Sequence, residues 1–382
     1  MKYIVTFFIS IVFLSYSHAQ NVSSKPKGDS VRLPHAHIIA YQFNRDFTSL
    51  DSIPIDTMLP RFQIYYKPFS ERALNVFLGN VNQPYTSVIF PNRPPMNEFL
   101  FSQHIEYNFH QPEDMIYYKT WTPFTQLTYF TGGPKTRQEQ KLNILHTQNV
   151  NKNLNVGFLG DLNYADGQYV NQRTRSNAFS LWAGYKGARY SAYGNITLNS
   201  YKGQENGGIT SDTTYLYHSD VSANNLPVNL QAANVAIKRQ SVFLNHRFYL
   251  TGSFKSDSLG RHSKWNEALS IIHQFRYDRY SRGFTDVLTT DSAFYQDPSI
   301  FMIKKNSTRD SVNFNQAATG DSSYFRRIEN TFMLAFNAND LLKVPAELRV
   351  GIKSQVDKYK YGSKLDSIGY MPALKKFSGV NP

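Results

Sequence analysis

Apolar and polar residues alternate between Leu154 and Tyr164, and this pattern predicts a β-strand with one apolar face. The even positions Leu154, Val156, Phe158, Leu162 and Tyr164 are apolar, interrupted only by Gly160, and Asn153, Asn155, Gly157, Asp161 and Asn163 stand at odd positions. A period of two residues is that of a strand. A second alternating run ends at Tyr201, and Gly187-Ala188 joins it to the run from Phe179 to Tyr185. These two runs predict a hairpin.

Tight turns alternate with long polar connections along the chain. The segment from Lys202 to Ala236 is rich in Gly, Asn and Ser and is far longer than a typical connection of about five residues. Strands joined alternately by tight turns and long loops are typical of outer-membrane barrels. A soluble β-sandwich has no reason to gather its long loops at one end. We therefore predict an all-β fold, an antiparallel transmembrane outer-membrane β-barrel, over residues 60–382.

Further alternating runs continue to Lys353. Val242, Leu244, Phe248 and Leu250 share one predicted face, and Leu269, Ile271, Phe275 and Tyr277 share another. His246 and His273 fall on these apolar faces, so we expect them near a membrane interface or beside a β-bulge. Beyond Lys353 the pattern stops, and the chain ends at Pro382, which cannot supply a central ladder hydrogen bond. Barrel chains commonly end in an aromatic residue on the last strand, whereas this one ends Gly379-Val380-Asn381-Pro382, so we expect a barrel that is incomplete at the C-terminus.

The N-terminal residues predict export. Residues 1–19 comprise Met1-Lys2, an apolar run from Tyr3 to Tyr16, and Ser17-His18-Ala19, which are the three regions of a secretory signal peptide. Residues 20–59 are poorly patterned and contain Pro34 and Pro54, so we expect a periplasmic arm that is partly disordered. The predicted location is the cell outer membrane.

Several short motifs resemble those of the porin family of Bacteroidetes-type bacteria. They are Phe62-Gln63-Ile64-Tyr65, Leu78-Gly79-Asn80, Thr122-Pro123-Phe124-Thr125-Gln126-Leu127-Thr128-Tyr129, Gly132-Gly133-Pro134-Lys135-Thr136-Arg137-Gln138-Glu139-Gln140, His146-Thr147-Gln148-Asn149, Asn153-Leu154-Asn155-Val156-Gly157 and Glu205-Asn206-Gly207-Gly208. The resemblance covers about Asp51 to Ile209. It implies an exported outer-membrane β-barrel that acts as a porin.

The composition fits a barrel. Aromatic residues make up 15% of the chain, with 28 Phe and 26 Tyr, and Tyr185 and Tyr190 flank a tight turn while Tyr164 and Tyr201 end their strands. These are the positions of an interfacial aromatic girdle, although Tyr is also simply a good strand residue. Mean hydropathy is -0.45, and no apolar run after the signal is long enough for a spanning helix. The chain has no Cys, which excludes disulfides, thiolate metal sites and Cys nucleophiles.

The formal net charge is +13. Five basic residues fall on predicted lumen-facing positions, where they would favour anions, and we predict them as pore-lining: Lys186, Arg247, Arg276, Arg349 and Lys353. The alternative is that the surplus lies in loops and turns, where it pairs with lipopolysaccharide phosphates or with Asp and Glu. Nucleic acid is not an expected partner of an exported chain.

Motifs for catalysis or cofactor binding are absent from the sequence. There is no phosphate-binding Gly-rich loop followed by Lys, no G-x-S-x-G elbow and no H-E-x-x-H, so we predict no enzyme, no cofactor and no metal site. His35 and His37 lack a third ligand and read as a solvated pair. A Ser and a His could meet across a barrel wall, as in outer-membrane lipases. Three Asp-Ser motifs resemble O-glycosylation sites, although such motifs more often begin Asx-turns. They are Asp257-Ser258-Leu259, Asp291-Ser292-Ala293 and Asp310-Ser311-Val312.

Three functions are compatible with these features. The first is a porin for small hydrophilic solutes, biased toward anions by a basic lumen. The second is a non-conducting structural or surface-interaction barrel that acts through its long loops. The third is a soluble periplasmic glycan-binding protein in which Trp121, Trp182 and Trp265 are stacking platforms. The expected partners are outer-membrane lipids, lipopolysaccharide and small solutes, and the sequence leaves the oligomeric state open.

Overall fold

The computed structural model describes residues 38–44, 47, 49–55, 74–93, 99–217, 222–256, 263–286, 319–337, 347–365 and 375–381. The unit of residues 1–37 lies outside these residues. With it lie the predicted signal peptide, His35 and His37, as do the strand expected near Arg61 and the three predicted Asp-Ser sites. Among the described residues no helix is both long and apolar enough to cross a bilayer.

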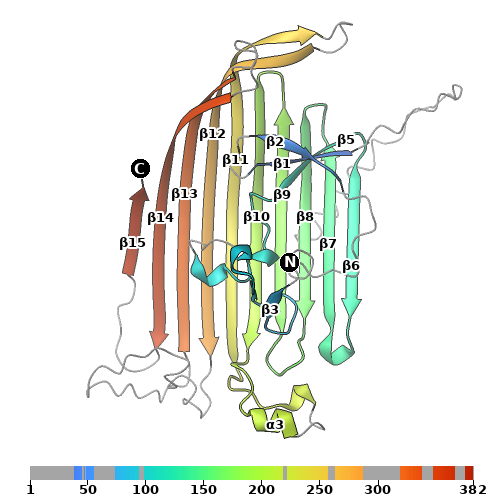
Figure 1. Cartoon of the computed structure of the whole chain (residues 1–382), viewed down its shortest axis with the longest axis vertical. Helices are drawn as coiled ribbons and strands as arrows, with labels where there is room; N and C mark the ends of the chain where they lie inside the picture. Colours follow the sequence, from blue (N-terminus) through green and yellow to red (C-terminus); the bar gives the residue numbers. More distant parts are fainter. Residues whose placement is uncertain are drawn as a thin grey trace, which may run out of the picture. The chain divides into compact units, whose positions relative to one another are not determined.

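Ten antiparallel strands form one large sheet in which neighbours along the chain are neighbours in space (Figure 1). They are β6 (Phe124–Gly132), β7 (Glu139–Asn149), β8 (Leu154–Ala165), β9 (Thr174–Lys186), β10 (Tyr190–Glu205), β11 (Ala233–Ser256), β12 (Ser263–Asp286), β13 (Thr319–Asn337), β14 (Glu347–Leu365) and β15 (Lys375–Asn381). The predicted hairpin is confirmed, because β9 pairs with β10 from Lys186 and Ser191 onward. The all-β antiparallel fold is also confirmed.

The sheet is open across the described residues. β6 and β15 are its two edge strands and are not neighbours in the strand order, so the predicted barrel, expected to be incomplete at the C-terminus, is not closed among these residues. The expectation that the pattern stops after Lys353 is wrong. β14 continues to Leu365, and β15 pairs with it from Lys375 to Asn381. Backbone pairing extends the sheet here although the apolar alternation has weakened.

The connections at the two ends of the sheet differ in length. At one end, strands are joined by residues 150–153, 187–189, 257–262 and 338–346. At the other end, which we call the loop end, they are joined by residues 133–138, 166–173, 206–232, 287–318 and 366–374. The connection 206–232 carries α3 (Asp212–Tyr217) and η7 (Ala223–Asn225) and lies beyond the strands in Figure 1. The predicted alternation of short and long connections is therefore present.

One face of the sheet buries many polar residues, and the other face exposes apolar ones. Along β9, the buried positions are polar or small apart from Trp182, whereas Phe179 and Leu181 are exposed. The same holds on β13, where Arg327 is buried and Phe332, Leu334 and Phe336 are exposed. We call the face with buried polar residues inward and the other face outward. Side-chain direction alternates along a strand, so strand pairing assigns every residue to one face.

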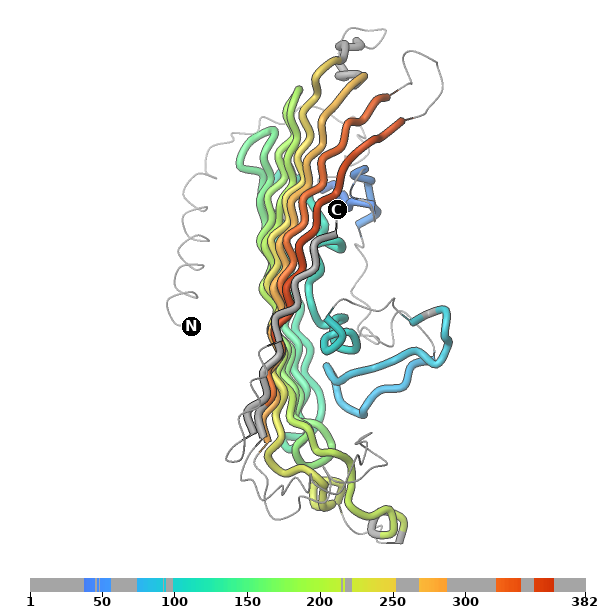
Figure 2. Tube along the Cα trace, turned by 90° about the vertical axis from the view of Figure 1, so that its left-hand side faces the viewer, coloured from blue at the N-terminus to red at the C-terminus, as the bar shows by residue number. Residues whose placement is uncertain are grey.

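A separate part of the chain covers the inward face. This inner segment consists of the described residues between 38 and 120, and Figure 2 shows it on one side of the sheet. Its elements are β1 (Ile38–Phe43), β2 (Leu50–Ile53), β3 (Asn75–Phe77), β4 (Tyr85–Ser87), η3 (Phe90–Asn92), η4 (Leu100–Ser102), η5 (Glu106–Asn108) and β5 (Ile116–Thr120). β2, β1 and β5 form a three-stranded sheet, and β3 pairs with β4. Among the described residues the large sheet begins at Phe124, and β1 and β2 lie within the range predicted as a periplasmic arm.

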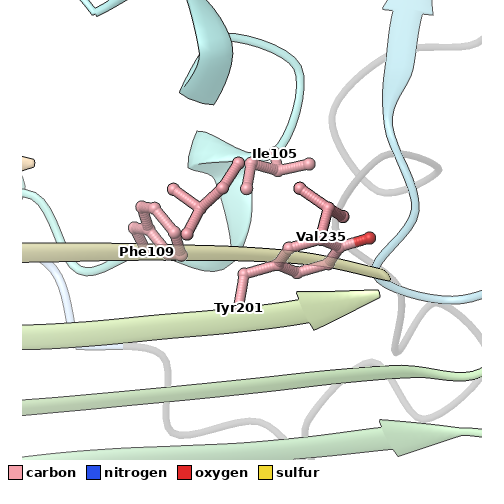
Figure 3. Close-up of a cluster of buried hydrophobic side chains, with 5 residues drawn as sticks. Ile105, Phe109, Tyr201 and Val235 are labelled. Atoms are coloured by element: carbon pink, nitrogen blue, oxygen red, sulfur yellow. The ribbon is translucent and has the colours of Figure 1, made fainter. Parts of the chain in front are cut away.

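Apolar clusters attach the inner segment to the inward face. Ile105 and Phe109 are buried against Tyr201, Val235 and Ile237 of β10 and β11 (Figure 3). A second cluster joins Met115 and Tyr117 of the inner segment to Trp182 of β9. Glycine makes room for that indole, because a Cβ on Gly157, which faces Trp182 across β8 and β9, would overlap the ring. The core of the molecule therefore lies between the sheet and the inner segment.

Candidate functional site: the inward face

The inward face carries balanced charge. In the strand segments whose side chains are described, nine inward residues are basic: Lys141, Lys186, Arg239, Arg247, Arg276, Arg282, Arg327, Arg349 and Lys353. Nine are acidic: Glu139, Asp161, Glu205, Asp278, Asp286, Asp321, Glu329, Glu347 and Asp357. The nine acidic residues of these strand segments therefore offset the charge of the nine basic ones.

All five residues predicted to line a pore occupy inward positions, and four of them are in ion pairs. The pairs are Arg247 Nη2 with Glu347 Oε1 at 2.5 Å, Arg276 Nε with Asp278 Oδ2 at 2.5 Å, Arg349 Nη2 with Glu347 Oε2 at 2.6 Å, and Lys353 Nζ with Glu329 Oε2 at 3.0 Å. Arg276 also contacts Glu113 of the inner segment. Lys186 is exposed at the end of β9 and forms no ion pair with any described residue.

The most deeply buried charged group is Arg239, whose side chain is 1% exposed. Its Nη2 lies 3.3 Å from Oδ1 of Asp278, and its guanidinium lies 5.0 Å from the ring centroid of Tyr280. Ser241 donates to the same Asp278 oxygen, and Arg239 also donates to Gln111 of the inner segment. A buried ion pair of this kind needs its remaining hydrogen bonds satisfied, and the inner segment supplies one of them. Both residues lie on the polar face of their strands, at odd positions on β11 and even positions on β12, and only strand pairing brings them together.

A histidine of the inner segment bridges two strands. His110 Nε2 lies 2.7 Å from Asp161 Oδ2 on β8, and His110 Nδ1 lies 2.7 Å from Ser180 Oγ on β9. With its proton on Nε2, the ring donates to the carboxylate and accepts from the hydroxyl. Asn199 of β10 binds the His110 backbone on both sides, accepting from its N–H and donating to its carbonyl oxygen.

Ser180, His110 and Asp161 are the residue types of a hydrolytic triad, but the arrangement does not fit that chemistry. Ser180 is 1% exposed, so its hydroxyl cannot meet a substrate from the lumen. A catalytic serine must lie within reach of the bond that it attacks. The three residues instead fix the inner segment to β8 and β9. A Ser of the sheet and a His of the inner segment therefore do meet, but in a structural role.

Aromatic rings fill the space around β1 and β5. The Phe43 ring lies edge-on to the rings of Tyr117 and Tyr193, with centroids 5.8 and 5.5 Å away. Asn195 of β10 donates to the Tyr117 hydroxyl oxygen at 3.0 Å. Burial raises the pKa of Tyr117, because the phenolate would lose its hydration there. Tyr117 therefore stays neutral and holds β5 against the inward face.

A hollow of about 280 Å³ remains between the inner segment and the sheet. His110, Gln111 and Asp114 line it from the inner segment, and Asn143, Leu159 and Trp182 line it from the sheet. Both polar and apolar side chains thus line this hollow. Trp182, predicted as a glycan-stacking residue, is 4% exposed, and Trp121 is 60% exposed. The side chain of Trp265 lies outside the described residues.

The two histidines that interrupt the outward face contact each other. His246 and His273 face each other across β11 and β12, with Nε2 of the first 2.8 Å from Nδ1 of the second. The His273 ring stacks on Phe332 at 4.2 Å. The β11–β12 register shifts between Tyr249 and Thr251, a few residues away. The predicted outward position of both residues is confirmed. The hydrogen bond between the two rings gives each one a polar partner on this apolar face.

Comparison with known proteins yields one match. A family model described as "Putative porin" matches residues 37–378 of the chain. No curated protein matches the chain, and neither does any solved structure. The matched region includes the inner segment and all of the large sheet up to β15.

Proposed function

Because the chain belongs to this porin family, we propose that it is an outer-membrane porin through which small hydrophilic solutes diffuse passively. In this proposal the large sheet forms membrane wall, the outward face contacts lipid and the inward face borders the solute path. Residues 1–19 act as the export signal, and the protein is a transporter rather than an enzyme.

The observation that carries the proposal is the reversed burial of the two faces. Outward residues such as Val350 and Ile352 are 67% and 77% exposed, while inward Thr197 and Ser180 are buried. A contiguous exposed apolar face of this extent is unfavourable in water and favourable in a bilayer. This argues against a soluble glycan-binding protein and supports a membrane wall.

The inner segment favours a second candidate, the non-conducting barrel. Hydrogen bonds of His110 and Gln111 and the ion pair of Glu113 with Arg276 hold it against the inward face, where it occupies space that a solute would need. A wide channel therefore requires this segment to shift or to leave a path beside it. The long connections at the loop end would then be the working part of a non-conducting barrel.

Selectivity for anions is a separate and weaker part of the proposal. Equal numbers of basic and acidic inward residues reduce the bias expected from Lys186, Arg247, Arg276, Arg349 and Lys353. Lys186 is the one of the five without an ion pair among the described residues, so we assign any anion preference chiefly to it. A preference of only a few-fold is expected from one exposed charge.

The test is single-channel recording in a planar bilayer with full-length protein purified from outer membranes. Discrete conductance steps under symmetric salt support the porin, and folded protein that inserts without conducting refutes it in favour of the non-conducting barrel. A salt gradient then measures selectivity. Lys186→Glu should shift the reversal potential toward cations. Lys141→Gln is the control, because Lys141 is an inward residue of β7 near the loop end, whereas Lys186 lies at the other end of the sheet. An unchanged potential would contradict the role of Lys186.

A further inference from the structure

Where its side chains are described, the outward face carries basic residues and no acidic ones. In the strand segments whose side chains are described, the charged outward residues are Arg175, Lys202, Lys238, Arg279, Arg326, Lys358 and Lys360. All seven are exposed. Every Asp and Glu of these segments points inward, as the balanced inward set shows. The charge surplus of the sheet therefore lies on the face that we assign to lipid.

These seven residues also lie in one band along the sheet. Each stands in the half of its strand that leads to the loop end, next to the connections 166–173, 206–232, 287–318 or 366–374. Beyond the band, toward the short turns, the outward positions become apolar, with Phe179, Ile196, Leu244 and Leu334 among them. We call these seven residues the basic band. The basic band lies at one edge of an apolar belt, which is where the membrane–water interface of a barrel lies.

Three members of the basic band stand directly opposite one another. Strand pairing aligns Arg279 of β12 with Arg326 of β13, and Arg326 with Lys358 of β14. None of the three forms an ion pair with a described residue. Like charges at directly paired positions are unfavourable unless a counter-charge lies between them. This row is therefore arranged for an anion that no described residue supplies.

A hollow of about 520 Å³ lies at the row. Arg279, Arg326, Lys358 and Lys360 line it together with Tyr277 and Tyr324. Tyr277 and Tyr324 are themselves outward residues of β12 and β13. Tyr rings prefer the headgroup level of a membrane, and Arg side chains bind phosphate oxygens through two parallel hydrogen bonds. The hollow thus combines phosphate donors with interfacial aromatic rings.

We infer that Arg279, Arg326 and Lys358 form a binding site for the phosphate groups of a phosphorylated lipid in the outer leaflet, of which lipopolysaccharide is the source. The inference rests on the proposed membrane wall, and it names the partner of its outward face. Bacterial barrels place their longer loops outside the cell, which puts the basic band at the outer leaflet. A free phosphate ion would gain nothing from the adjoining apolar belt, whereas acyl chains lie against it.

The experiment measures binding of purified lipopolysaccharide to the full-length protein folded in detergent, by native mass spectrometry. The test variant is Arg326→Gln with Lys358→Gln. The matched control is Lys202→Gln with Lys238→Gln, which removes two exposed outward charges that do not line the hollow. Losing two headgroup contacts should weaken binding about thirtyfold in the test variant. The control should lose less than about threefold.

Two further probes identify the source of the phosphate. Lipopolysaccharide stripped of its phosphates should bind about thirtyfold more weakly than the intact lipid. Inorganic phosphate at millimolar concentration should fail to displace it. The inference is overturned if the test and control variants weaken binding equally, if dephosphorylation has no effect, or if inorganic phosphate binds the row as tightly as the lipid.

Conductance of the same preparations separates this inference from the proposed function. Wild-type protein that conducts but shows no dependence on Arg326 and Lys358 refutes the lipid site and leaves the porin intact. Folded protein that binds the phosphorylated lipid at this row without conducting supports the lipid site and refutes the porin.

Discussion

Arg239 and Arg279 stand on the two faces of the same sheet and have opposite environments. Arg239 is buried, with Asp278, Gln111 and Ser241 around it. Arg279 is exposed, and its paired neighbour across β13 is another arginine. The inward face thus pairs most of its described charges with one another, whereas we propose that an external partner supplies the counter-charge for the outward arginines. The same residue type stabilises the fold on one face and marks a contact surface on the other.

Replacing Arg239 should have the largest effect on stability. Removing one partner of a buried ion pair usually costs about 3–5 kcal/mol. Arg239→Met should lower the free energy of unfolding by about 3 kcal/mol. This is the lower end of that range, because Arg276 still forms an ion pair with Asp278 in the variant. Arg279→Met should change it by less than about 0.5 kcal/mol. Urea unfolding of both variants in lipopolysaccharide-free detergent checks this, and equal losses would mean that the two faces do not differ as described.

A charge placed within the apolar belt should have the next largest effect. Leu334 is outward and lies between Ile271 and Val350 on the neighbouring strands. Leu334→Arg should destabilise the folded, inserted protein by about 2–4 kcal/mol, because a lipid-facing arginine is unfavourable near the bilayer midplane. Thr331→Arg, an inward position on the same strand, should cost much less. Folding into vesicles, followed by the heat-dependent shift in gel mobility, distinguishes the two, and equal insertion would contradict the assignment of the faces.

The sheet was largely predictable from the sequence because strand alternation is a local property. Phe179, Leu181 and the hairpin that follows fall where their period of two places them, and parity assigned Arg247 and Arg349 to the correct face. Arg279 and Arg326 lie on the outward face, where the same alternation puts them. Their significance depends on the register between strands, which aligns residues that are far apart in the chain.

The inner segment could not be predicted in the same way. His110 meets Asp161 and Ser180, which are 51 and 70 residues away in the chain. Short 3-10 helices and three-residue strands carry no strong periodic pattern, so this region reads as irregular or disordered. Contacts that decide whether a lumen is filled are made between distant residues, and no local signal specifies them.

Loosening the inner segment should have an intermediate effect. His110→Ala removes the contacts to Asp161 and Ser180, and lost hydrogen bonds of buried groups cost about 1–3 kcal/mol. Hydrogen exchange of residues 105–118 should therefore become about tenfold faster, and if this segment restricts the lumen, the open conductance should rise. His104→Ala, an exposed histidine of the same segment, is the control. Identical exchange in the two variants would show that His110 does not hold the segment in place.

The smallest expected effect concerns Tyr117. Tyr117→Phe loses the hydrogen bond from Asn195. It should lower the free energy of detaching β5 from the inward face by about 1 kcal/mol at neutral pH. Burial raises the pKa of Tyr117, so the docked segment favours the neutral phenol. Its stabilisation is fully present below the ordinary tyrosine pKa of about 10 and is lost as the pH rises above that value. Alkaline pH should therefore accelerate hydrogen exchange of β5 in the wild type more than in Tyr117→Phe. If both proteins respond equally to alkaline pH, then Tyr117 is not the group whose ionisation detaches β5, and the aromatic contacts with Phe43 and Tyr193 hold the strand independently of the hydroxyl.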